Sequence, residues 1–145
     1  MGHLVRRFFQ SLSRRVPDDA ETADLRVLMT TNEYELWKSM SASDQRHSLM
    51  VVKRFRQRLP DATPDEIVGV ALHDVGKVES RLGTIGRVVA TVVGPRTKRF
   101  ASYHEHERIG QRLLRAGGSS SAVLALLDGS ARRAALDAFR WADDC

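Results

Sequence analysis

The most informative stretch of this sequence is Val70-Ala71-Leu72-His73-Asp74-Val75-Gly76-Lys77. Two strongly polar side chains, His73 and Asp74, stand here among aliphatic residues of a helix that should be buried. A buried charge is costly unless it is paired or binds a metal. Because imidazole and carboxylate groups are both good metal ligands, the dipeptide is either an ion pair in the core or half of a metal site.

The helix that carries this dipeptide has a clear start signal. Thr63-Pro64-Asp65-Glu66 offers an N-cap, a proline at the first helical position and a glutamate three residues after the cap. Gly76 is a suitable stop, so the sequence predicts a helix over 64–76. One helix earlier, Ser41 and Asp44 indicate the start of a helix over 42–59, and His47 lies on the face that Val51 and Phe55 turn to the core.

The remaining sequence also reads as helices. Residues 84–93 are ambiguous, because their β-branched content suits a strand as well as a buried helix, but no other segment would pair with them as a strand. The fold prediction is therefore all-α, a single compact helical bundle. We divide it into an N-terminal basic amphipathic helix with a lead-in helix (1–32) and a helical domain (33–145). The other expected helices are 2–15, 20–30, 32–40, 105–116, 119–127 and 130–144.

Composition limits the class of protein. The 145 residues are 42% hydrophobic and 28% charged, which suits one globular domain. The net charge of +5 suits an anionic partner. Cys145 is the single cysteine, so no disulfide within the chain and no cysteine zinc cluster can form, and a reducing, cytoplasmic compartment is expected. The longest apolar stretch is too short for a transmembrane segment.

Candidate ligands recur on the core-facing sides of several helices. In the helix over 105–116, His106 shares a face with Ile109, whereas His104 does not. In the last helix, Asp143 shares a face with Phe139. Taken singly, each polar residue could be a satisfied core histidine or a capped carboxylate. Taken together, they suit a divalent metal ion such as Mn, Fe, Zn, Co or Ni, without choosing among these metals. These residues are His47, His73, Asp74, His106 and Asp143.

The chain resembles the HD-domain metal-dependent phosphohydrolase superfamily over about residues 33–144. The resemblance is carried by His47 in Arg46-His47-Ser48-Leu49, by His73-Asp74, by His106 in His106-Glu107-Arg108-Ile109-Gly110, and by Asp143 in Trp141-Ala142-Asp143-Asp144. It implies an all-α fold, metal ligation by the residues matching His47, His73, Asp74 and Asp143, and hydrolysis of phosphate esters, most often of nucleotides or nucleotide second messengers.

One departure from the family pattern concerns the number of metal ions. Family members with two metals usually carry a histidine pair between the positions that match His106 and Asp143. This chain has no histidine from 107 to 145, and Asp128-Gly129 stands about where the pair would be. We therefore expect one tightly bound ion, with His106 left to serve the phosphate.

The expected chemistry follows from a metal-activated water. Asp74 could orient that water. Lys77 could bind phosphate as a point charge, or it could be only a solvated cation at the C-terminal end of its helix. His106 could bind the phosphate or donate a proton to the leaving group. The basic run with Arg96 and Arg99 could guide an anionic small-molecule phosphate substrate, although such runs more often only solvate a surface.

Two alternatives compete with a phosphohydrolase. The first is a degenerate HD domain that binds a nucleotide or a protein partner without catalysis, which the missing histidine pair favours. The second is a basic helical nucleic-acid binder. The positive charge favours that alternative, but the chain has no recognised DNA-binding motif and is only 6% aromatic, which leaves few rings for base stacking. The sequence does not indicate an oligomeric state.

Overall fold

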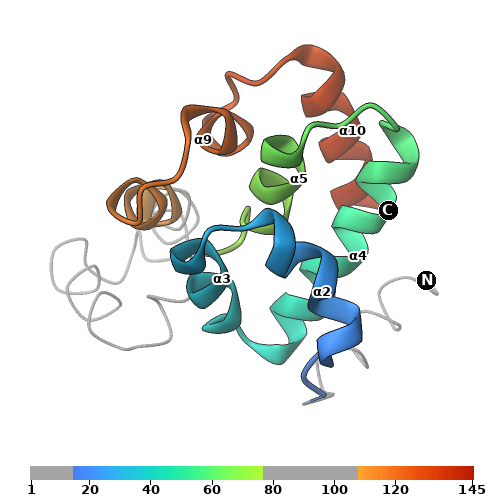
Figure 1. The fold of residues 1–145 in the computed structure, drawn as a ribbon. Helices are drawn as coiled ribbons and strands as arrows, with labels where there is room; N and C mark the ends of the chain where they lie inside the picture. Colours follow the sequence, from blue (N-terminus) through green and yellow to red (C-terminus); the bar gives the residue numbers. More distant parts are fainter. Residues whose placement is uncertain (1–14, 77–107) are drawn as a thin grey trace, which may run out of the picture.

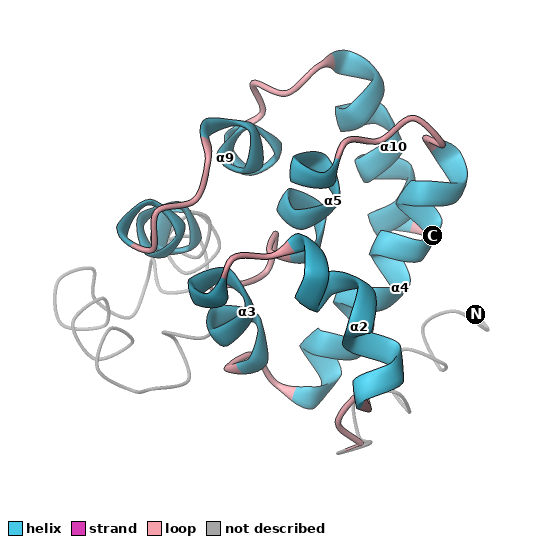
Figure 2. Cartoon of the chain, in the orientation of Figure 1, coloured by secondary structure: helices cyan, strands magenta, loops and turns pink. Residues whose placement is uncertain are grey.

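The structure, a computed structural model, describes residues 15–76 and 108–145, and these two ranges contain helices and loops but no strand (Figures 1 and 2). Over these described residues, the all-α prediction is confirmed. The predicted helix over 2–15 lies outside the described residues except for its last residue, and the segment 84–93 lies wholly outside them. The division at residue 32 stays a prediction. The helices are α2 (Asp19–Leu28), α3 (Thr31–Lys38), α4 (Ala42–Arg58), α5 (Pro64–Ala71), a helix described over 108–116, α9 (Ser121–Asp128) and α10 (Arg133–Asp144).

Helix α5 lies at the centre of this arrangement. It packs against α2, α4 and α9, while α4 also packs against α10 (Figure 1). Every residue from Glu66 to Ala71 is buried, and Val70, Ala71 and Leu72 are fully inaccessible to solvent. The quoted stretch therefore begins in the middle of the core, where burial of apolar area is the main stabilising contribution. Among residues 15–76 and 108–145, no helix has the length and apolarity needed to cross a membrane.

The helix starts agree with the signals in the sequence. The Ser41 hydroxyl accepts a hydrogen bond from the backbone N–H of Asp44. At α5, Thr63 and Glu66 form the reciprocal capping box that the sequence predicts. The helix over 108–116 ends at Gly117-Gly118, as expected, with Gly118 in the left-handed conformation at a φ of 83°.

The predicted end of α5 is wrong. The helix ends at Ala71 instead of Gly76, and residues 72–76 form turns. The Val75 N–H donates to Leu72 O, three residues back, rather than continuing the four-residue helical pattern. The Ser48 hydroxyl, from α4, donates to Ala71 O at 2.7 Å. His73 and Asp74 therefore leave the helix in a turn and do not lie on a helical face.

A charged pair joins the start of α5 to the start of α10. Arg132, the N-cap residue of α10, donates from Nε and from a terminal nitrogen to the two carboxylate oxygens of Glu66, at 2.8 and 2.9 Å. Glu66 is only 6% exposed, and the hydrogen bonds from Arg132 lower the pKa of its carboxyl group. This bidentate contact fixes the N-terminal end of α10, the helix that carries Asp143.

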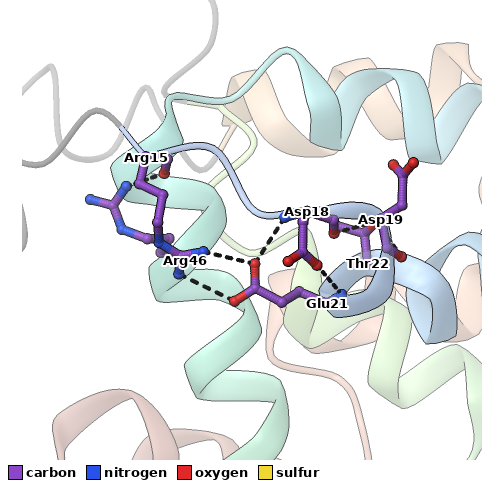
Figure 3. Close-up of polar contacts among 6 residues, drawn as sticks. All are labelled: Arg15, Asp18, Asp19, Glu21, Thr22 and Arg46. Carbon is purple, nitrogen blue, oxygen red and sulfur yellow. Dashed lines mark hydrogen bonds and ion pairs between the residues drawn. The ribbon is translucent and has the colours of Figure 1, made fainter.

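The segment before α2 is attached to α4 (Figure 3). The Arg15 guanidinium donates to both carboxylate oxygens of Glu21, which also belongs to the capping box of Asp18. The Arg46 side chain donates to the carbonyl oxygen of Arg15. Arg46 directly precedes His47, so this contact ties the chain before α2 to the part of α4 that carries the first candidate ligand.

The close approach of α5 to α9 at Gly69 gives a test of the packing. A Cβ atom on Gly69 would lie 2.8 Å from Val123 O and 2.9 Å from the Leu126 Cβ, both in α9. We expect Gly69→Ala to destabilise the protein by about 1–3 kcal/mol, because α5 and α9 must move apart. The measurement is urea unfolding. Helix propensity alone predicts a gain of about 1 kcal/mol, so a more stable variant would contradict the packing described here.

Candidate metal centre

The site begins with a contact between α4 and α10. His47 Nε2 lies 3.0 Å from Asp143 Oδ1, although the two residues are far apart in the sequence. Arg54, two turns after His47 on α4, donates to the carbonyl oxygens of Ala142 and Cys145 at 3.4 and 2.8 Å. Carbonyls in the last turn of a helix lack partners within the helix. Arg54 therefore holds the last turn of α10 in place and with it the Asp143 side chain.

The turn after α5 supplies the second imidazole. His73 Nε2 lies 3.3 Å from Asp74 Oδ2 and 3.4 Å from Asp143 Oδ1. The other ring nitrogen, Nδ1, lies 2.7 Å from Val70 O and donates to it. This bond fixes the ring, and the Phe139 ring packs on it edge-to-face at 5.1 Å between centroids. Nε2 is thereby directed toward the two carboxylates.

Together these contacts bring the four expected ligands to one place. One ligand atom each from His47, His73 and Asp74 lies within 4.8 Å of the other two, and Asp143 Oδ1 contacts both imidazoles. The other two acidic side chains of α10, those of Asp137 and Asp144, are exposed. Asp143 is therefore the carboxylate of α10 that turns inward.

The charges in this cluster are strongly coupled. Burial lowers the pKa of His73, but the contacts of its Nε2 with Asp143 and Asp74 outweigh burial and raise the pKa of His73 to about 10. Hydrogen bonds from His47 and His73 in turn hold the pKa of Asp143 below its usual range. Without an ion, a proton on His73 compensates part of the charge of the two carboxylates.

The donor set fits a divalent first-row metal ion. Two imidazoles and two carboxylates are partly withdrawn from solvent, with side-chain exposures of 20% for His47, 11% for His73, 20% for Asp74 and 37% for Asp143. The bond from His73 Nδ1 to Val70 O is the kind of outer contact that orients a ligating histidine. With a proton on His73 and no ion, the same four residues also form an ion-pair cluster.

Four of the residues expected in the site lie outside the described residues. These are Lys77, His106, Arg96 and Arg99, and their roles stay predictions. Sequence reasoning missed Ser48, Arg54 and the packing role of Phe139. Ser48 follows His47 directly, but its bond to Ala71 depends on how α4 and α5 cross, and no local sequence signal reports that crossing.

Comparison of this chain with protein-family models, with curated proteins and with solved structures gives no match.

The proton on His73 leads to a pH prediction for the protein treated with chelator. Because the pKa of His73 is higher in the folded protein, its contribution to stability is complete below about 6.5, its ordinary value, and is lost as pH rises through about 10. We expect wild type to lose stability over this range, and His73→Gln to lose much less. Urea unfolding at several pH values measures both, and parallel curves for the two proteins would contradict the coupling.

Proposed function

We propose that this chain is a metal-dependent phosphohydrolase acting on a phosphate ester of a nucleotide or nucleotide-derived substrate. The observation that supports the proposal most is the cluster of His47, His73 and Asp74, whose two imidazoles both contact Asp143. These groups come from α4, from the turn after α5, and from α10. The net charge of +5 also suits an anionic substrate.

The donor atoms favour a Lewis-acid role for the site. A divalent ion bound there would supply polarisation of the phosphoryl group and a water of lowered pKa. The ligands would be His47, His73, Asp74 and Asp143, with Mn, Fe, Zn, Co and Ni all compatible with nitrogen and oxygen donors. We expect one ion, because the chain has no histidine from 107 to 145.

The residues of the chain have distinct tasks in this proposal. His73 is fixed through Val70 O, and Asp143 holds its carboxylate against both imidazoles. Asp74, 20% exposed, is accessible to water and could orient the attacking nucleophile. Lys77 and His106 would serve the substrate phosphate, His106 also as proton donor to the leaving group, with Arg96 and Arg99 as guides for the anion.

The test combines metal content with turnover. Wild type, purified without chelator, should carry about one divalent ion per chain and hydrolyse p-nitrophenyl phosphate, bis-p-nitrophenyl phosphate or a nucleotide from a panel. Chelator should lower its melting temperature, because an ion bound only by the folded state stabilises that state. Asp74→Ala should abolish activity and metal retention without unfolding the protein, since it also removes a partly buried charge.

Asp144→Asn is the matched control, because Asp144 is the exposed neighbour of Asp143 on the same helix. It should keep both the ion and the activity. An ion without turnover on any substrate would favour the degenerate domain that only binds. If chelator changes neither melting nor activity, and Asp74→Ala remains active, then His73-Asp74 is a structural pair and the phosphohydrolase proposal fails.

A further inference from the structure

We propose that Ser48 is a positioning residue, whose hydroxyl group ends α5 at Ala71 and so places His73 and Asp74 beside His47 and Asp143. The inference extends the proposed metal site. It rests on the proposed function only in the experiment that measures ion binding. It starts from the disagreement between the sequence, which favours a helix through Gly76, and the structure, in which the helix is five residues shorter.

Ser48 is a fully buried polar group with two partners. Its side chain is 0% exposed. It accepts a hydrogen bond from the Trp37 indole N–H at 3.0 Å and donates to Ala71 O at 2.7 Å. A hydroxyl group has one proton to give, and Ala71 O is the acceptor of the two partners, so the Ser48 proton lies toward Ala71. The Ser48 hydroxyl on α4 thus links Trp37 of α3 to Ala71, the last residue of α5.

The bond to Ala71 lies where the helix would otherwise continue. In an uninterrupted helix, Val70 O and Ala71 O would accept from the N–H groups of residues 74 and 75. Instead, Val70 O accepts from the His73 ring at 2.7 Å and from the backbone N–H of the same residue at 3.3 Å, and Ser48 donates to Ala71 O. The Val75 N–H turns to Leu72 O at 3.0 Å. Val70 O is therefore bonded to the ring and the backbone of His73, and Ala71 O to the Ser48 side chain, in place of the N–H groups of residues 74 and 75.

The position of this helix end decides the geometry of the site. Consecutive residues of a helix point about 100° apart, so a helix that continued through Gly76 would direct His73 and Asp74 to different sides. The turn instead brings His73 Nε2 and Asp74 Oδ2 to 3.3 Å from each other. Ser48 directly follows His47 on α4. These two neighbouring residues therefore supply one expected ligand and fix the residue at which α5 ends.

The test compares Ser48→Ala with Trp37→Phe. Ser48→Ala removes both buried hydrogen bonds of the hydroxyl group, and Trp37→Phe removes only the bond from the indole N–H. Both variants should be less stable than wild type. Only Ser48→Ala frees Ala71 O. We expect it to weaken Mn²⁺ or Zn²⁺ binding by about 10–100-fold, the range typical of lost outer contacts at metal sites, whereas Trp37→Phe should keep the wild-type affinity.

A second readout needs no ion. In the metal-free protein, the carbon chemical shifts of residues 72–76 should become helical in Ser48→Ala. The nuclear Overhauser contact between the His73 and His47 rings, whose centroids lie 5.8 Å apart, should disappear. Trp37→Phe should retain the wild-type shifts and the contact between the rings.

Each failure has a separate meaning. If Ser48→Ala is destabilised but keeps its metal affinity and its shifts at 72–76, Ser48 only supports the core and the inference is wrong. If Ser48→Ala does not fold, Ser48→Cys, with a weaker donor, should shift affinity and spectra in the same direction, and wild-type values would overturn the inference. A wild type that binds no ion would overturn the proposed function, while the spectra would still decide the role of Ser48.

Discussion

The carboxylate of Asp143, shared by the imidazoles of His47 and His73, is the contact on which the rest of the site depends. Its Oδ1 lies 3.0 Å from one ring nitrogen and 3.4 Å from the other. Such a cluster is costly to bury unless its charges are compensated. A proton on His73 supplies compensation in the absence of an ion, and a divalent cation could replace that proton. The binding of metal and the release of protons are therefore coupled in this account.

Much of the surrounding structure holds that carboxylate in place. Arg132 and Glu66 fix the beginning of α10, and Arg54 bonds the carbonyl groups at its other end. Between them, Phe139 packs against the His73 ring. Close packing at Gly69 also holds α5 against α9. The site thus stands between helices that are fixed at several points, which is the condition for holding ligands ready before an ion binds.

The sequence predicts the elements well where the signal is local. Capping at Ser41 and Thr63, the core-facing position of His47 and the inward turn of Asp143 all follow from residues within one or two helical turns. The end of α5 does not, because the bond from Ser48 to Ala71 spans 23 positions of the chain. The pairing of Glu66 with Arg132 spans 66 positions. Such contacts depend on how the helices cross, and a periodic pattern cannot report them.

An anomalous diffraction map of crystals grown with Mn²⁺ shows directly whether these four side chains bind one ion. The account predicts one peak within about 2.0–2.2 Å of donor atoms from His47, His73, Asp74 and Asp143, the range of nitrogen and oxygen ligands to a first-row ion. The same crystals of Asp143→Asn should show a much weaker peak. A wild-type map without density among these four side chains, with Asp143 still in contact with both imidazoles, would contradict the account and leave the cluster as a proton-bound ion pair.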